Sequence, residues 1–158
     1  IDLGFVDKDN LFIAGGSAGG IATAYAVGLT QRYKAAAVVK PIINWLSKVL
    51  TGDSYLYQTF HQFPGVPWEN VEHYWKRSPL SLVGNVTTPT MLMTGEADRR
   101  TPISESEQFY QALKIRKVDT VMVRIPGSPH GIANKPSRMI EKVEYMLAWF
   151  EKYRTPAQ

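Results

Sequence analysis

The sequence contains no cysteine and no long apolar run. Without cysteine, the chain forms no disulfide framework, no cysteine-containing zinc site and no thiol nucleophile. The absence favours a reducing compartment, and we expect a cytoplasmic protein. The longest uninterrupted apolar stretches, such as residues 35–39, are far shorter than the roughly 20 residues that a membrane-spanning helix needs. No basic segment followed by an apolar one opens the chain, so we expect neither a leader nor a membrane anchor.

Charge of one sign is not concentrated anywhere in the chain. The 158 residues include 18 Lys and Arg against 14 Asp and Glu, a net charge of +4. The basic residues are scattered, with the densest groups at 99–100 and 114–117, which is typical of a solvated surface and not of a nucleic-acid interface. Three scattered histidines and the lack of a cofactor motif predict neither a metal nor a cofactor. With 44% apolar and 20% charged residues, the composition is that of one packed globular domain.

Short apolar segments alternate with helical patterns along the chain. The apolar segments predict strands at 11–14, 35–39, 90–94 and 121–125, and the helical patterns predict helices after Gly20, over 102–117 and over 136–153. Thr101 is a suitable N-cap for the second helix. The expected core face of the third helix is Ile140, Val143, Leu147 and Phe150. This alternation predicts an α/β fold with a mostly parallel sheet flanked by helices, over which residues 44–84 add helices and loops.

A glycine-rich turn lies between the first strand and the first helix. Residues 15–19 form a G-x-S-x-G pattern, which places Ser17 on a sharp strand-to-helix turn. In this setting the Ala18 N–H is directed at a developing oxyanion, aided by the helix N-terminus. A dinucleotide fingerprint needs glycine where Ser17 stands, and a phosphate loop needs lysine where Ile21 is found. A purely structural glycine-rich turn is the remaining alternative.

A nucleophilic serine needs a base, and the chain offers three histidines. His130 follows the fourth predicted strand, so we expect it at the same carboxyl edge of the sheet as Ser17. His61 and His73 lie in the aromatic-rich segment 44–84, and we expect them to be surface or packing residues. His130 is therefore the predicted base.

The base in turn needs a carboxylate that holds its tautomer. Asp98 follows the third predicted strand, again at the carboxyl edge. Glu96 competes with it but lies nearer the strand. Asp53 and Asp119 are in less suitable places, and Asp119 is expected at the opposite edge. The resulting chain order of serine, aspartate and histidine is that of α/β-hydrolases.

Longer stretches of the sequence resemble the prolyl oligopeptidase family, most closely its acylaminoacyl-peptidase-like branch. The matching segments run along nearly the whole chain, at 15–20, 67–70, 74–80, 85–90, 95–102, 107–110 and 126–131. The resemblance implies a serine peptidase in which Ser17 is the nucleophile, Asp98 the orienting carboxylate and His130 the general base. Two positions depart from the family pattern, which often has Tyr in place of Ala18 and Gln near Glu105.

The resemblance also implies an incomplete domain. The family's catalytic domain begins well before the nucleophile strand and usually follows a β-propeller, whereas only 16 residues precede Ser17. Residues 1–158 are therefore expected to be the C-terminal portion of a single α/β-hydrolase domain that lacks the first strands and the upstream oxyanion donor. We expect its exposed sheet edge to pair with a second copy, as a homodimer, or with the missing N-terminal part.

These features predict hydrolysis of short or N-acylated peptides through a Ser-Asp-His triad and an acyl-enzyme. An esterase with the same triad and an inactive fragment that associates through its sheet edge are the alternatives. Ile42, Ile43, Trp45 and Val49 follow the second strand and are candidates for an apolar substrate pocket, with core packing as an equal alternative. Arg100 is a candidate for binding a substrate carbonyl or for a structural salt bridge. The expected partner is a peptide substrate, without nucleic acid, membrane, metal or cofactor.

Overall fold

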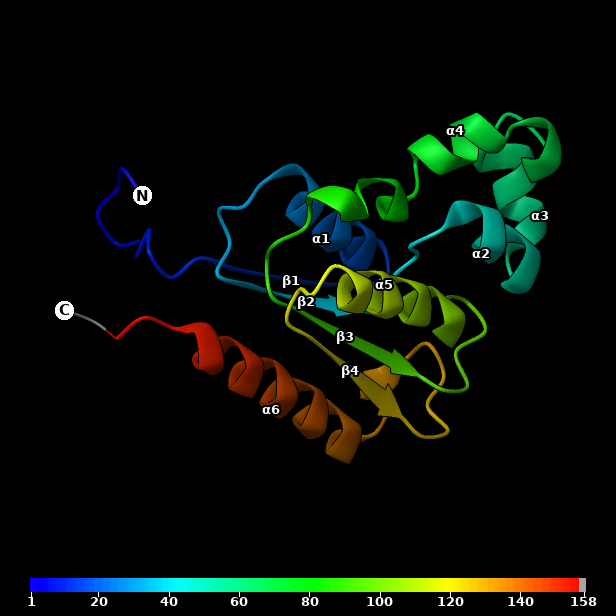
Figure 1. Ribbon diagram of the computed structural model, residues 1–158. Helices are drawn as coiled ribbons and strands as arrows, with labels where there is room; N and C mark the ends of the chain where they lie inside the picture. The colour runs from blue at the N-terminus through cyan, green and yellow to red at the C-terminus, as the bar shows by residue number, and fades with distance from the viewer. Residues whose placement is uncertain (157–158) are drawn as a thin grey trace.

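Parallel strands form one sheet in the computed structural model, which describes residues 1–156. The strands β1 (Phe12–Gly16), β2 (Ala35–Val39), β3 (Thr90–Gly95) and β4 (Thr120–Ile125) lie side by side in that order (Figure 1). Every neighbouring pair is parallel, so the predicted strands and the α/β fold are confirmed. Within the described part of the chain, β1 and β4 are the edge strands. The carboxyl ends of the strands face the same side of the molecule.

Helices cover both faces of the sheet. α1 (Ala18–Leu29) and α5 (Ile103–Ile115) pack on one face, and α6 (Pro136–Tyr153) packs on the other (Figure 1). Side chains alternate between the two faces along each strand. Val38 and Leu92 belong to the core beneath α1 and α5, whereas Val39 and Met91 belong to the core beneath α6. β2 and β3 are consequently buried on both faces, as their continuous apolarity predicted.

α5 begins later than its predicted cap. Pro102 occupies the N-cap position and Ile103 is the first helical residue, so the prediction of Thr101 as the N-cap was wrong. The Thr101 hydroxyl instead donates a hydrogen bond to the carboxylate of Asp98, 3.0 Å away. The Thr101 side chain thus bonds to a carboxylate after β3 and does not cap the backbone N–H groups at the start of α5.

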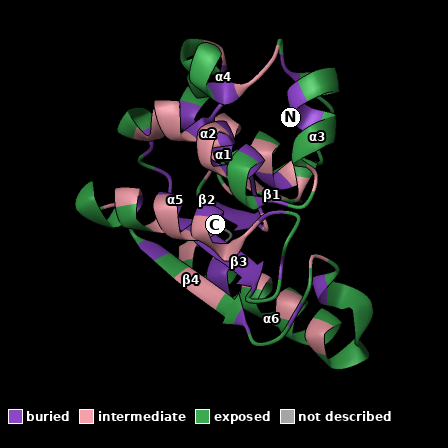
Figure 2. Ribbon diagram, turned by 90° about the vertical axis from the view of Figure 1, so that its right-hand side faces the viewer, coloured by how far each residue is buried: buried purple, intermediate pink, exposed green. Residues whose placement is uncertain are grey.

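α6 packs on the sheet through a different face from the predicted one. Trp149 is buried there, and Phe150 packs beside it. Ile140, Val143 and Leu147 are exposed, so only Phe150 of the predicted core face is correct. The inward face is the one that carries Trp149 and Phe150, which pack on the core beneath α6. Figure 2 shows most of α6 as exposed or only partly buried. Among the described residues, no helix combines the length and the apolarity that crossing a bilayer requires.

The segment between β2 and β3 is helical, as predicted. It contains α2 (Trp45–Thr51), α3 (Tyr55–Tyr57), the π-helix η1 (Gln58–Gln62), the 3₁₀ turn η2 (Pro67–Glu69), α4 (Val71–Lys76) and the 3₁₀ segment η3 (Pro79–Asn85). α2, α3 and α4 lie beyond the carboxyl ends of the strands (Figure 1). α2 and α4 share an apolar cluster in which the Phe63 ring stacks on Tyr74 and meets Trp45 edge-on. After β4, a 3₁₀ turn, η4 (Ile132–Asn134), precedes α6.

Glu105 fastens this helical layer to α5. Its carboxylate is buried and accepts hydrogen bonds from the backbone N–H groups of Ile43 and Asn44, at 2.9 and 2.8 Å. The Ser47 hydroxyl donates at 2.6 Å and the Gln108 amide at 3.3 Å. Burial raises the pKa of the Glu105 carboxyl above its ordinary value, although these hydrogen bonds act against that shift. The side chain thereby holds the loop that connects β2 to α2.

Replacing Glu105 with alanine should lower the free energy of unfolding by about 2–6 kcal/mol. The reason is that two buried N–H groups lose their acceptor, and each unsatisfied group costs about 1–3 kcal/mol. Glu107→Ala is the matched control, because Glu107 is a half-exposed residue of the same helix whose ion pair with Arg124 contributes about 0–1 kcal/mol. Urea denaturation measures both variants, and equal losses would contradict the anchoring role of Glu105.

Candidate active site

Ser17 lies on the turn that joins β1 to α1. Its backbone has φ 59° and ψ −118°, a conformation that costs a non-glycine residue on the order of 1–3 kcal/mol. The Ser17 N–H donates to the Val39 carbonyl of β2, and the Ser17 carbonyl accepts from the Ile21 N–H of α1, both at 3.0 Å. Strand and helix together therefore hold the serine at the carboxyl edge of the sheet.

Gly15 allows α1 to begin close against β1. A Cβ at this position would lie 2.1 Å from the carbonyl oxygen of Gly19 and 2.8 Å from the Thr23 hydroxyl. Any larger residue would therefore force the backbone apart. A Cβ at Gly19 would meet no atom within 4 Å. The crowding in this motif therefore arises at its first glycine and not at its last.

The structure brings together three side chains from loops at three strand ends. His130 Nε2 lies 2.9 Å from Ser17 Oγ, and His130 Nδ1 lies 2.7 Å from Asp98 Oδ2. Both distances are those of hydrogen bonds. A continuous chain of hydrogen bonds thus runs from the serine hydroxyl through the imidazole to a buried carboxylate.

Asp98 is held by the loop that leads into α5. Its Oδ1 accepts hydrogen bonds from the backbone N–H groups of Arg100 and Thr101, both at 2.9 Å. Its Oδ2 accepts from the Thr101 hydroxyl at 3.0 Å. These donors fix the carboxylate in the orientation that faces His130. Thr101 is therefore part of the site, a role that its prediction as a helix cap missed.

Lys40 is a second residue of the site that sequence reasoning missed. It directly follows β2 with φ 42°, and its ammonium donates to the backbone carbonyl of His130 at 2.6 Å. Its own carbonyl accepts from the Thr101 hydroxyl at 3.2 Å. Burial lowers the pKa of Lys40, although the nearby Asp98 acts to raise it. Lys40 therefore connects the end of β2 to the loops that follow β3 and β4. Its position directly after a predicted strand was the sequence feature that could have indicated a residue of the site.

The other histidines and two of the other carboxylates lie away from Ser17. Glu96 is exposed and forms a surface ion pair. Asp119 immediately precedes β4, which places it at the opposite edge of the sheet, as expected. His61 is exposed in η1, and the His73 ring in α4 packs edge-on against Phe63, which agrees with the surface and packing roles expected of them.

Asp53 reaches the site, contrary to expectation. Its carboxylate pairs with the Arg100 guanidinium at 2.5 Å, because the turn after α2 passes over the loop that follows β3. The Asp53 N–H also donates to the Arg99 carbonyl at 2.8 Å. Arg100 therefore forms the structural salt bridge that was one of its two predicted roles, and its side chain stays half-exposed beside the site.

Ala18 presents a backbone N–H beside the serine. It is the first residue of α1, and the first N–H groups of a helix have no acceptor within the helix. Together they form the positive end of the helix dipole. Ala18 also lines the same cavity as Ser17, so its N–H is available to a negatively charged oxygen there.

A cavity of about 290 Å³ opens beside Ser17, beneath the helical layer. Three of the candidate pocket residues, Ile42, Trp45 and Arg100, line it. Ile43 does not line it: this side chain is fully buried in the core beneath α1 and α5, so its prediction as a pocket residue was wrong. Successive side chains of an extended segment point to opposite sides, and only one of these two isoleucines can face the cavity.

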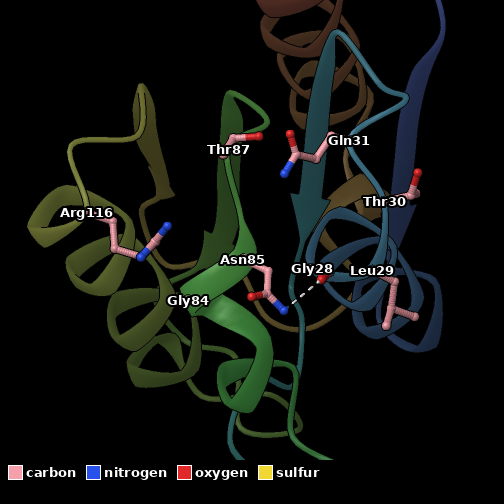
Figure 3. Close-up of a pocket in the computed structure, with 8 residues that line it drawn as sticks. All are labelled: Gly28, Leu29, Thr30, Gln31, Gly84, Asn85, Thr87 and Arg116. Atoms are coloured by element: carbon pink, nitrogen blue, oxygen red, sulfur yellow. Dashed lines mark hydrogen bonds between the residues drawn. The ribbon is translucent and has the colours of Figure 1, made fainter.

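A larger cavity, of about 430 Å³, lies at the other end of the sheet (Figure 3). The end of α1 and the loops that enter β2, β3 and β4 form it, and its lining includes Gln31, Asn85 and Arg116. The Asn85 amide donates to the Gly28 carbonyl across it at 3.4 Å. These residues precede strands, whereas the hydrogen-bonded serine, histidine and aspartate follow them. This cavity is therefore separate from the candidate site.

In the α/β-hydrolase fold, loops at the carboxyl ends of the strands supply a serine, an aspartate and a histidine in this chain order. This sheet has that arrangement. Comparison with known families gives the narrower assignment. The model of the prolyl oligopeptidase family matches residues 1–156, and the chain belongs to this family. The resemblance inferred from the sequence is thereby confirmed.

Individual relatives agree with the family assignment. The chain is 36% identical over 150 residues to the "uncharacterized peptidase YuxL" of Bacillus subtilis, covering 94% of this chain and 23% of the relative. It is 30% identical over 162 residues to the acylamino-acid-releasing enzyme of Arabidopsis thaliana, covering 97% and 21%. The solved acylaminoacyl peptidase of Pyrococcus horikoshii matches with a TM-score of 0.88 and 27% identity, covering 97% of this chain and 25% of that one. The chain thus spans about a quarter of the length of these relatives.

The crowded turn predicts opposite outcomes for two alanine substitutions. Gly15→Ala should lower the free energy of unfolding by about 1–3 kcal/mol, the usual cost of overpacking. Gly19→Ala should leave it unchanged or raise it by up to about 1 kcal/mol, because alanine is the better helix former and no atom lies in its way. Urea denaturation of both variants checks this. A loss at Gly19 as large as that at Gly15 would contradict the close approach of α1 to β1.

Proposed function

We propose that this chain carries the catalytic residues of a serine peptidase, which hydrolyses short or N-acylated peptides through an acyl-enzyme. Ser17 is the nucleophile, His130 the general base and Asp98 the carboxylate that orients the imidazole. The observation that supports these roles is the hydrogen-bond chain of 2.9 and 2.7 Å through His130, with the serine on a turn of positive φ. Membership of the prolyl oligopeptidase family supports the reaction class.

Acylation begins when Ser17 Oγ attacks the scissile carbonyl carbon and His130 Nε2 takes the hydroxyl proton. The Asp98 carboxylate accepts a hydrogen bond from Nδ1–H and stabilises the imidazolium that forms. When the tetrahedral intermediate collapses, the C–N bond breaks and the leaving amine takes the proton from His130. Water then attacks the acyl-enzyme with His130 again as the base, which releases the acid and restores the hydroxyl of Ser17.

The Ala18 N–H is the proposed donor to the oxyanion of each tetrahedral intermediate. Its position as the first residue of α1 leaves it without a helical partner. One such donor stabilises the transition state by about 2.7–4 kcal/mol in serine proteases. The helix N-terminus adds partial positive charge at the same place.

The choice of peptides as substrates rests on the relatives. The chain resembles an acylamino-acid-releasing enzyme and an acylaminoacyl peptidase, and these names support N-acylated peptides as the substrate class. The serine, histidine and aspartate alone serve ester hydrolysis equally well. The identity of the bond cleaved is therefore the point that a direct assay must decide.

Ser17→Ala should abolish covalent labelling by a fluorophosphonate probe, because the hydroxyl that attacks the phosphorus is gone. Asp98→Asn should lower kcat by about 10⁴-fold, as the equivalent change does in serine proteases, since the imidazole loses its correct tautomer. Glu96→Gln is the matched control, a neighbouring carboxylate that is exposed and paired at the surface, and should keep the wild-type kcat. Mass spectrometry and p-nitroaniline release measure the outcomes. Labelling that persists without Ser17 would contradict its role.

An N-acetylated aminoacyl p-nitroanilide should be hydrolysed by the wild type and not by Ser17→Ala, because a peptidase protonates and expels an amine. The p-nitrophenyl ester with the same acyl group is the comparison, since its leaving group departs without protonation. Turnover of the ester alone would favour the esterase interpretation. Loss of both activities, together with self-association in light scattering, would favour the inactive fragment.

A further inference from the structure

Lys48 is a buried cation in the wall of the cavity beside Ser17. It lies in α2, none of its surface is exposed to solvent, and it lines this cavity together with Ser17 and Ala18. Lysine is almost never fully buried unless it is paired with an opposite charge. The Lys48 ammonium is therefore a candidate for binding an anion that enters the cavity.

The hydrogen-bond partners of the Lys48 ammonium are neutral. Its Nζ donates to the Ser54 hydroxyl at 2.7 Å and to the Gln58 side-chain carbonyl. An ammonium group has three donors. Within residues 1–156, no carboxylate lies at ion-pair distance from it. The Trp45 ring centroid lies 6.0 Å from the ammonium. The buried charge thus has polar and aromatic contacts but no counter-ion at ion-pair distance.

The nearby carboxylates are already engaged. Asp53 pairs with Arg100, Asp98 belongs to the chain of hydrogen bonds at the serine, and the loop before α2 surrounds Glu105 with donors. Burial lowers the pKa of Lys48 to about 8. The charged groups that act on it are the carboxylates of Asp53, Glu105 and Asp98, which favour its charge, and Arg100, which opposes it. At neutral pH the ammonium consequently keeps its proton.

The cavity that contains Lys48 is on the acyl side of the proposed reaction. It includes both Ser17, which holds the acyl group, and Ala18, whose N–H receives the oxyanion. His130 also lines this cavity, and with Pro129 it borders a second cavity of about 300 Å³ that does not include the serine.

We propose that Lys48 makes the cavity a pocket for a carboxylate, so that preferred substrates carry an aspartyl or glutamyl residue on the acyl side of the scissile bond. This inference rests on the proposed function and specifies its substrate class. The incoming carboxylate accepts a charge-assisted hydrogen bond from the ammonium, and such bonds are stronger than those between neutral groups. Trp45 and Ile42 line the same cavity and provide apolar surface for the methylene groups of the substrate side chain.

The test compares N-acetyl-glutamyl and N-acetyl-glutaminyl p-nitroanilides, which differ in charge and share one leaving group. At pH 7 the wild type should favour the glutamyl substrate in kcat/KM by about 10- to 100-fold, the range of a hydrogen bond to a charged group. Lys48→Met should abolish this preference while it retains turnover of the glutaminyl substrate. Lys76→Met, an exposed residue of α4, removes the same charge from the surface and should keep the preference.

The preference should also depend on pH. In kcat/KM, the ionisation that matters is that of the free enzyme, where the pKa of Lys48 is about 8. The glutamyl-to-glutaminyl ratio should be highest below pH 8 and should fall above it, because the ammonium loses its charge. The ratio cancels every ionisation that affects both substrates equally. A ratio that stays constant from pH 7 to pH 10 would contradict the assignment to Lys48.

Two further measurements separate the two proposals. Fluorophosphonate labelling of Ser17 reports the proposed function without using the Lys48 pocket. If Ser17 is labelled but both p-nitroanilides react alike, the pocket assignment is wrong and the hydrolase proposal stands. If Ser17 is not labelled, or if Lys48→Met fails to fold, binding of N-acetyl-glutamate α-amide to the wild type decides. NMR titration should show tighter binding of this amide than of N-acetyl-glutamine α-amide, and equal affinities would overturn the inference.

Discussion

The buried carboxylate of Asp98 is the interaction on which the candidate site depends. It orders the loop after β3 by accepting hydrogen bonds from Thr101, and it joins that loop to the one after β4 by its hydrogen bond to His130. His130 in turn reaches Ser17 after β1, and Lys40 after β2 holds the His130 carbonyl. Because the strands are parallel, each contributes one residue at the same edge of the sheet. One desolvated carboxylate thereby connects loops that lie far apart in the sequence.

The turn at Ser17 is strained, and the neighbouring strand and helix maintain it. A positive φ costs a serine on the order of 1–3 kcal/mol, which hydrogen bonds to β2 and within α1 offset. The close approach at Gly15 brings the start of α1 against the end of β1. The same geometry places the Ala18 N–H and the Ser17 hydroxyl in one cavity. The turn between β1 and α1 therefore produces both the backbone strain at Ser17 and the placement of its hydroxyl beside the Ala18 N–H.

Two buried charges beside the site have contrasting surroundings. The Glu105 carboxylate accepts hydrogen bonds from two backbone N–H groups and two side chains, so it acts as an internal anchor for the loop before α2. The Lys48 ammonium, in α2 itself, contacts the neutral oxygens of Ser54 and Gln58 and the Trp45 ring, and it borders an open cavity. A buried charge whose hydrogen-bonding groups are satisfied stabilises the fold. One that lacks a counter-ion is a candidate for binding a ligand of opposite charge.

The sequence by itself determined the strands, the order of the helices, the turn at Ser17 and the chain order of Ser17, Asp98 and His130, because apolar runs, glycines and strand-end residues are local signals. It did not determine which side of an extended segment faces the cavity, and Ile43 was assigned to the wrong side. It also did not show which face of α6 is buried. Only the tertiary structure decided these points and left Lys48 without a counter-ion. Each depends on distances between elements far apart in the chain, which no local pattern records.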